Sequence, residues 1–229
     1  MENQIKHFKV EKVEKIIDSK NIDDLMDCIK SLEITASPIG EGGNAIVYVA
    51  EGTVFEKVCL KKIKEKPQIL YNDIDQEHKY QMMAREAGVS TPLSLVSINT
   101  SEGDYLIMER VDGHSVGDIV RNQDLLPKNF DAQVFCNSLV DQVSKMHKRG
   151  LYHRDLHFNN VMITKDSQAV IIDFGTATEG TGSDYTYEEG VRMYNSQNGR
   201  YDFVNGFFKD DKKMVQNIIA NVKGFSPQK

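Results

Sequence analysis

A glycine-rich stretch near residue 40 has the composition of a phosphate-binding turn. Residues 39–48 read IGEGGNAIVY and place Gly40 and Gly42 between two predicted strands. Glycine has no Cβ, so backbone amides at such a turn can approach an anion closely, as in a flap over phosphates. A plain hairpin turn is the simpler explanation of the same residues. Lys61 follows at the end of the next apolar stretch, where a lysine normally points to water from an edge strand.

Two later segments carry acidic, basic and amide side chains at fixed spacing. Residues 152–160 read YHRDLHFNN, and Asp173-Phe174-Gly175 begins thirteen residues beyond Asn160. These segments match HRDxxxxN and DFG at seven specified positions, which random sequence would do at about one start site in a billion. The chain is therefore similar to the protein-kinase superfamily over about residues 35–180.

The resemblance implies a role for each matched residue. Asp155 would accept or orient the proton of the substrate hydroxyl as it attacks the γ-phosphorus of ATP. Asn160 and Asp173 would hold Mg²⁺ against the phosphate oxygens. Lys61 would neutralise the α- and β-phosphates, held in place by Glu77 sixteen residues further on. The residues expected around the nucleotide are Gly40 and Gly42 over the triphosphate, Cys59 above the adenine, Val47 and Met162 on either side of its ring, Met108 as gatekeeper, and Glu109 and Val111 as the hinge.

Two of these assignments have competing interpretations. Glu77 could instead be an exposed surface glutamate, with Asp73 or Asp75 as poorer partners for Lys61. Cys59 stands where the family usually has a small alanine, and its thiol is a candidate for labelling by nucleotide analogues.

The elements that must position these residues follow from hydrophobic periodicity and from glycine turns. Helices are predicted over residues 74–87, 115–122 and 131–148, strands over 34–39, 45–50, 54–63, 93–99 and 104–109, and short apolar segments over 160–163 and 169–172. A strand-rich half thus precedes a helix-rich half, which predicts an α+β fold with two lobes. The aromatic rings of His153 and Phe174 are expected to pack inside this fold.

The resemblance divides the chain into an antiparallel N-lobe at residues 35–110, a hinge at about 108–113 and a C-lobe at 114–229. Residues 1–34 have apolar positions at helical spacing and are predicted to form an extension of two short helices. Only 54 residues follow Gly175, without an APE motif, and residues 202–206 resemble DxWxxG only loosely. We therefore expect a truncated, mainly helical C-lobe.

Composition excludes several kinds of partner. With 28 Lys and Arg against 34 Asp and Glu the net charge is −6, so nucleic acid is not an expected partner. No apolar run approaches the roughly 18 residues of a membrane helix, so membrane insertion is not expected. The charged N-terminus is unlike a secretory signal, which predicts a cytoplasmic protein or one delivered into a host cell by a signal-peptide-independent secretion system. The oligomeric state is left open.

Three functions fit the motifs. The favoured function is that of a compact Ser/Thr protein kinase. This hypothesis includes a protein substrate and an activating protein partner. Such an enzyme resembles the kinases that bacterial pathogens deliver into host cells and the small RIO and lipopolysaccharide-kinase-like enzymes. A small-molecule kinase of the aminoglycoside or choline type fits DLHxxN but usually lacks DFG. A catalytically inactive nucleotide-binding scaffold is disfavoured because every charged catalytic position is filled.

Overall fold

The computed structural model describes residues 12–16, 33–34, 37–51, 58–70, 72–100, 103–180, 191–195, 197, 200–204 and 210–225. The chain falls into two compact units. The first holds Met1–His78, Leu93–Arg110 and Arg192–Phe203, and the second holds Lys79–Pro92, Val111–Val191 and Val204–Lys229. The chain passes from the first unit to the second after Arg110, within the segment predicted as the hinge.

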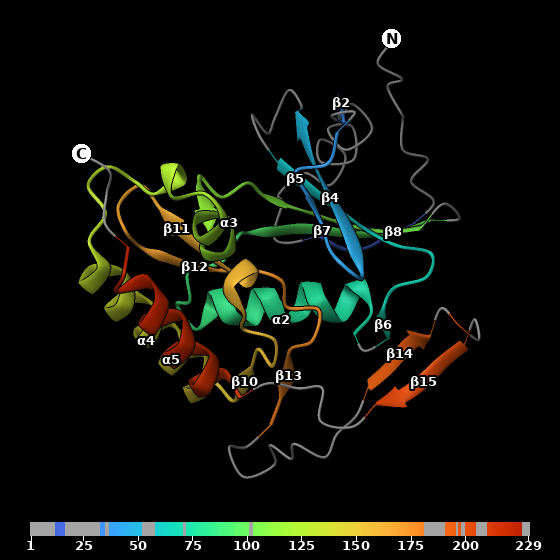
Figure 1. The fold of residues 1–229 in the computed structure, drawn as a ribbon. Coiled ribbons are helices and arrows are strands. Elements are labelled where there is room, and N and C mark those ends of the chain that lie inside the picture. Colours follow the sequence, from blue (N-terminus) through green and yellow to red (C-terminus); the bar gives the residue numbers. More distant parts are fainter. Residues whose placement is uncertain are drawn as a thin grey trace. The chain divides into compact units, whose positions relative to one another are not determined.

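The first unit is built on an antiparallel sheet. Its strands run in the order β1-β7-β8-β5-β4-β2, with β3 also paired to β4 (Figure 1). They are β1 (Lys12–Ile16), β2 (Glu33–Ile34), β3 (Gly40–Glu41), β4 (Ala45–Glu51), β5 (Val58–Ile63), β7 (Ser94–Thr100) and β8 (Gly103–Glu109). Leu60 of β5 pairs with Ile107 of β8, and both side chains are 1% exposed. Burying such a side chain contributes roughly 1.5–3 kcal/mol, which fixes these central strands.

Helix α2 (Ile74–Glu86) starts in the first unit and ends in the second. Asp73 and Gln76 cap its start reciprocally: Gln76 N donates to Asp73 Oδ1 at 2.8 Å, and Asp73 N donates to Gln76 Oε1 at 3.1 Å. Gly88 follows its end with φ +79°, a left-handed conformation that glycine adopts at little cost. The helix predicted over residues 74–87 is confirmed.

A second sheet of the first unit joins distant parts of the chain. Strand β6 (Ile69–Leu70) pairs with β14 (Val191–Asn195), which in turn pairs with β15 (Arg200–Val204). Residues 192–203 thus belong to the first unit, whereas the predicted C-lobe over residues 114–229 includes them. No local pattern predicts this pairing, because Arg192 faces Leu70, 122 residues earlier.

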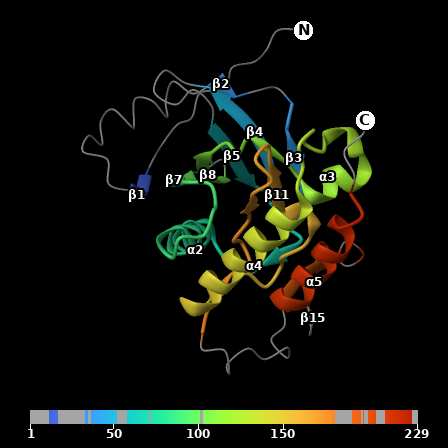
Figure 2. The same ribbon diagram turned by 90° about the vertical axis from the view of Figure 1, so that its left-hand side faces the viewer.

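Helices dominate the second unit, and the predicted α+β class is confirmed. The helices are α3 (Val116–Arg121), α4 (Ala132–Lys148) and α5 (Asp211–Val222), with short turns η1 (Gln123–Leu125) and η2 (Phe158–Asn160). The strands are β9 (Gly113–Ser115), β11 (Val161–Thr164) and β12 (Ala169–Ile171) in the order β12-β11-β9, and the pair β10 (Leu151–Tyr152) and β13 (Thr178–Glu179). Helix α4 packs against α5 (Figure 2), and it also packs against β12.

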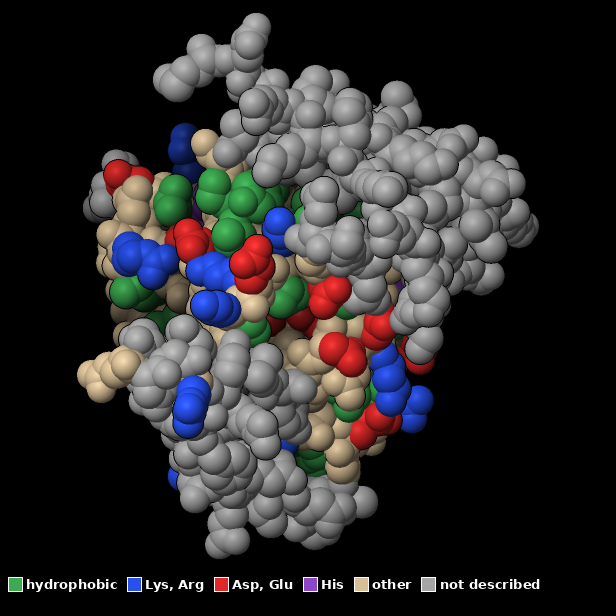
Figure 3. All heavy atoms as spheres, turned by 90° about the vertical axis from the view of Figure 1, so that its right-hand side faces the viewer, with side chains coloured by type: hydrophobic (Ala, Val, Ile, Leu, Met, Phe, Trp, Pro, Cys, Tyr) green, Lys and Arg blue, Asp and Glu red, His purple; other side chains and the backbone are tan. Residues whose placement is uncertain are grey.

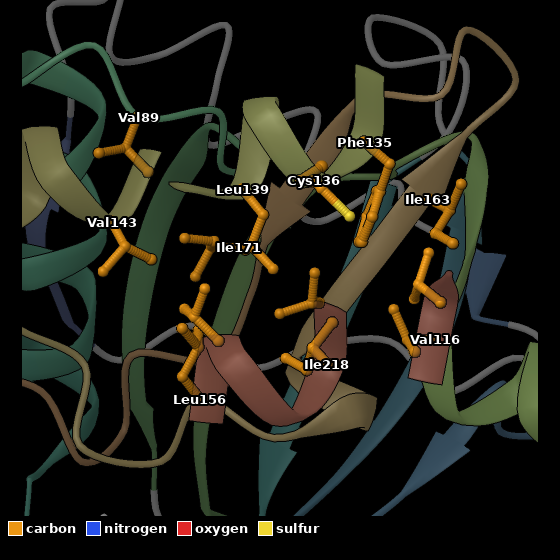
Figure 4. Close-up of a cluster of buried hydrophobic side chains, with 14 of the residues drawn as sticks. Val89, Val116, Phe135, Cys136, Leu139, Val143, Leu156, Ile163, Ile171 and Ile218 are labelled. Atoms are coloured by element: carbon orange, nitrogen blue, oxygen red, sulfur yellow. The ribbon is translucent and has the colours of Figure 1, made fainter. Parts of the chain in front are cut away.

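The core of the second unit gathers side chains from its helices and its sheet (Figure 4). Phe135, Leu139 and Val143 recur every four residues, so they lie on one face of α4. They belong to the same buried cluster as Ile171 of β12 and Ile218 of α5. This packing fixes the strand that leads into the DFG segment.

The N-terminal segment differs from its prediction where it is described. Lys12–Ile16 form strand β1, antiparallel to β7 and with a bulge between Val13 and Lys15, instead of a helix. Apart from β1 and β2, the predicted helical extension lies outside the described residues. A strand forms because the edge of β7 offers backbone partners, whereas a short isolated helix is only marginally stable. Of the strand predicted over residues 34–39, Ile34 belongs to β2, residues 35–36 lie outside the described residues, and residues 37–39 are not in a strand.

The described surface mixes both signs of charge. On the face in Figure 3, Lys and Arg side chains are interspersed with Asp and Glu side chains. Among the helices of the described part of the chain, none has the length and apolar character needed to cross a membrane.

Candidate active site

Strand β5 holds Lys61 in the middle of the first sheet. Lys61 pairs with Val47 of β4 on one side and with Leu106 of β8 on the other, so the edge-strand interpretation is wrong. Its Nζ donates to Glu77 Oε1 at 2.6 Å, and the two residues are only 6% and 3% exposed. Burying two charges costs desolvation free energy, and their mutual attraction offsets this cost only in part. A buried ion pair therefore adds little to the stability of the fold, which favours a functional role for the Lys61 ammonium. The alternative of an exposed Glu77 is wrong.

The other two carboxylates considered for Lys61 have different partners. Asp73 caps α2, and Asp75 Oδ1 accepts from Ser97 Oγ at 2.5 Å. Burial raises the pKa of Asp104, and the charges of Asp75 and Asp73 raise it further. The two carboxylates at the start of α2 therefore act on Asp104 of β8.

The glycine-rich turn connects β3 to β4. Gly40 pairs with Val47, and Gly42 N donates to Ala45 O at 3.0 Å, which closes a turn shorter than the predicted one. A Cβ added at Gly42 would meet no described atom within 4 Å, and one added at Gly40 would meet only Val47 Cβ at 3.9 Å. This space is what a ligand needs to approach the backbone closely.

The first-unit residues expected near the adenine lie on three neighbouring strands, with Val47 on β4, Cys59 on β5, and Met108 and Glu109 on β8. Cys59 of β5 pairs with Met108 of β8. Cys59 is 8% exposed, and burial raises the pKa of its thiol to about 11 against the opposing effect of Arg110. Glu109 ends β8, where its N donates to Leu93 O at 2.9 Å and its Oε2 accepts from Leu93 N at 3.1 Å. The backbone at the end of β8 is thus held at both Glu109 N and the Glu109 side chain.

Two residues expected near the adenine belong to the second unit. Val111 is its first residue after β8 and is half-buried. Met162 lies on β11, paired with Val170 of β12 and with Ser115 of β9, and is also half-buried. Both side chains therefore retain some exposed surface.

A buried carboxylate anchors the segment that contains Asp155. Asp211 Oδ2 accepts from His153 N, and its Oδ1 accepts from Arg154 N, both at 2.9 Å. Asp211 is 2% exposed, and His147 Nε2 lies 2.9 Å from the same Oδ2. Arg154 has φ +67°, a conformation that costs a non-glycine residue on the order of 1 kcal/mol and persists only where its surroundings impose it.

The sequence does not predict the role of Asp211, since the loose resemblance to DxWxxG falls on residues 202–206 instead. The local signal for a helix start is Asp210, the N-cap of α5, whose Oδ1 accepts from Lys212 N at 2.8 Å. Acidic residues are common in the first turn of any helix. The sequence therefore does not mark which of them binds an amide 57 residues away.

Hydrogen bonds join the two segments that carry the expected Mg²⁺ ligands. Asn160 Nδ2 donates to Asp155 O at 2.9 Å, and Ile172 N donates to Asn160 O at 3.0 Å. Because its amide nitrogen is used in this way, the side-chain carbonyl oxygen of Asn160 is the atom suited to bind a cation. Asp173 is exposed at φ +67°, with Gly175 N donating to its Oδ1 at 3.2 Å. A carboxylate and an amide oxygen on joined segments are ligands that fit Mg²⁺.

The HRD and DFG segments also pack through their aromatic rings. His153 and Phe174 are fully buried, with ring centroids 5.0 Å apart. His153 Nε2 donates to Ile172 O at 3.0 Å, and Thr176 Oγ1 donates to His153 O at 3.1 Å. The predicted internal packing of both rings is confirmed.

His157 is a residue beside Asp155 that sequence reasoning left without a role. Its Nε2 lies 3.5 Å from Asp155 Oδ2, and its Nδ1 accepts from Asn159 N at 3.1 Å. Because Nδ1 is an acceptor, the neutral ring carries its proton on Nε2, which faces the carboxylate.

A cavity of about 320 Å³ is lined by Gly117, Val120, Arg121, His157, Phe158 and Asn159.

Comparison with known proteins agrees with these features. The protein kinase domain family matches residues 34–198, more than half of the chain. Sperm motility kinase 2B of Mus musculus is 31% identical over 141 residues, which cover 62% of this chain and 28% of the mouse protein. A probable serine/threonine-protein kinase of Clostridium perfringens is 25% identical over 156 residues, 67% of this chain and 22% of its own length. The hormonally up-regulated neu tumor-associated kinase of Homo sapiens is 28% identical over 147 residues, 62% of this chain and 20% of its own length.

The chain spans less than a third of the length of these relatives. The matched range contains the glycine-rich turn and both the HRD and the DFG segments, whereas Asp211 lies beyond it. On this match, the chain belongs to the protein kinase family.

Proposed function

We propose that the chain is an ATP- and Mg²⁺-dependent kinase that transfers the γ-phosphate of ATP to a serine or threonine hydroxyl of a protein. The observation that carries the proposal is the buried pair of Lys61 and Glu77. An inactive scaffold gains little from a desolvated ammonium, whereas a kinase uses that charge on the phosphates. The protein kinase family match, and a relative named as a probable serine/threonine-protein kinase, favour a protein hydroxyl over a small molecule.

The side chains divide the chemistry between them. Lys61 Nζ binds phosphate oxygens while Glu77 fixes its position. Asp155 orients the substrate hydroxyl and takes its proton, a role that contributes about 10²–10⁴ in rate. His157, whose Nε2 lies 3.5 Å from Asp155 Oδ2, helps to hold that carboxylate in place. Mg²⁺, when bound by oxygen ligands such as Asn160, neutralises charge on the phosphates.

The test compares the phosphoproteomes of cells that express the wild type and Asp155→Ala. We expect phosphoserine and phosphothreonine sites that occur only with the wild type. The control is Lys145→Met, which removes one exposed lysine and its 2.7 Å ion pair with Asp141 on α4 and should reproduce the wild-type sites. Identical site lists for the wild type and Asp155→Ala would contradict the proposal.

Purified protein separates the remaining classes of function. ADP release on aminoglycosides or choline, without protein phosphorylation, would assign the chain to the small-molecule kinases. No ADP release and no phosphorylation, even with cell extract added, would favour the scaffold. Phosphorylation that requires the extract would support an activating partner.

A further inference from the structure

The glycine-rich turn of this chain contains a carboxylate. Glu41 lies between Gly40 and Gly42, at the end of β3, and its side chain is exposed. Under the proposed function, on which this inference rests, the turn covers the triphosphate of ATP. A carboxylate at that position would repel the phosphate anions unless another charge neutralises it.

Lys64 supplies such a charge. Its Nζ donates to Glu41 Oε1 at 2.6 Å, with the lysine side chain 28% exposed and the glutamate side chain 58% exposed. Lys64 directly follows β5, three residues after Lys61, so the same strand that carries the buried lysine also delivers this partner.

Backbone contacts hold the turn against the same segment. Lys64 N donates to Asn44 O at 2.9 Å, and Gln68 N donates to Gly43 O at 3.0 Å. At Gly43 an added Cβ would lie 2.9 Å from Gln68 Cβ, so only glycine fits this approach. Residues 64–68 thus hold the turn at three of its positions: at Glu41 by a side chain, and at Gly43 and Asn44 by the backbone.

We propose that Lys64 is a positioning residue for nucleotide binding, which neutralises Glu41 and keeps its carboxylate turned toward residues 64–68. Exposed ion pairs contribute little to the stability of a fold, so a stabilising role alone does not explain the pair of Lys64 and Glu41. Phosphate binding gives a stronger one, because the carboxylate and the triphosphate carry charges of the same sign. The pair then acts on ATP through its phosphates and leaves the contacts of the adenosine part unchanged.

The test is a set of charge variants of the full chain, with ATP and adenosine affinities measured by calorimetry. Lys64→Met should weaken ATP binding about fivefold at low salt, because it exposes the Glu41 carboxylate to the phosphates. Adenosine carries no phosphate, so its affinity should change less than about twofold. Glu41→Gln should bind ATP at least as tightly as the wild type.

The double variant Lys64→Met with Glu41→Gln decides between two roles of the lysine. If Lys64 acts by neutralising Glu41, the double variant should regain ATP affinity to within about twofold of the wild type. A double variant as weak as Lys64→Met would overturn the proposal, since Lys64 would then act on phosphate directly. Equal losses for ATP and adenosine in Lys64→Met would also overturn it, because they indicate a disrupted turn.

Lys145→Met is the matched control, since it removes one lysine and one exposed ion pair on α4, and its ATP affinity should equal that of the wild type. Failure of the wild type to bind ATP at all would contradict the proposed function itself. That result differs from wild-type binding of ATP with no effect of Lys64→Met, which would overturn only this inference.

Discussion

Lys61 and Asp155, one in each unit, are held in position by different kinds of contact. The ammonium of Lys61 is held by a buried ion pair with the Glu77 carboxylate at 2.6 Å. Asp155 is fixed through the backbone around it: the two preceding amides bind Asp211, and Asn160 binds its carbonyl. The position of the Lys61 ammonium therefore depends on a partner side chain, whereas that of Asp155 depends on a loop conformation and on a carboxylate remote in sequence.

The largest combined loss of stability and of transfer should come from Asp211→Ala. The variant leaves the buried N–H groups of His153 and Arg154 without their acceptor, so the free energy of unfolding should fall by about 3 kcal/mol in urea denaturation. Phosphate transfer should fall at least about 100-fold, because Arg154 can then relax from φ +67° and displace Asp155.

Its neighbour provides the control for this anchor. Asp210→Ala removes the N-cap of α5 and should cost about 1 kcal/mol of stability with transfer unchanged. Equal losses of transfer in the Asp210 and Asp211 variants would show that α5 acts as a whole helix, against the anchor role of Asp211.

In the first unit, loss of the Lys61–Glu77 pair should abolish transfer without lowering the stability of the fold. Replacing both partners, Lys61→Met with Glu77→Leu, should abolish transfer yet leave the free energy of unfolding within about 1 kcal/mol of the wild type or above it. Glu77→Leu alone should cost about 3 kcal/mol, because the Lys61 ammonium stays buried without the carboxylate. If thermal denaturation gave the double variant a lower melting temperature than Glu77→Leu alone, the contrast drawn between Lys61 and Asp155 would be contradicted.

Metal removal tests the second unit's oxygen ligands. ATP with Mg²⁺ at 100 times its dissociation constant should stabilise the wild type by roughly 2.7 kcal/mol, and EDTA should reduce this gain. In Asp173→Ala, the gain with ATP should be the same with and without Mg²⁺. A persistent Mg²⁺ dependence in that variant would place the metal on other residues.

A further prediction concerns Cys59, the candidate thiol for labelling by nucleotide analogues. Burial raises its pKa from 9.0 to about 11, so the reactive thiolate should be about 100-fold scarcer near pH 8 than for an ordinary cysteine. Labelling by iodoacetamide, followed by mass spectrometry, should be slow at pH 8 and should rise with each pH unit up to about 11. If Cys59 of the folded protein were labelled as fast as in the urea-unfolded chain, the burial of its thiol would be contradicted.

Local sequence patterns predicted the parts of the molecule that local forces determine. The α2 helix and strands β4 and β8 lie close to their predicted bounds, and the pairing of Lys61 with Glu77 follows the family's spacing. Contacts that join distant segments were missed, since neither the pairing of β6 with β14 nor the bonds to Asp211 leave a periodic signal. Delivery into a host cell stays a prediction.

The most direct test of the account measures ATP affinity and phosphate transfer together in purified Asp155→Ala and wild type. A base that acts on the substrate hydroxyl contributes to the chemical step and not to nucleotide binding. The account predicts ATP affinity within about twofold of the wild type and transfer to a protein substrate lowered by about 10²–10⁴. Transfer at the wild-type rate in Asp155→Ala would contradict it.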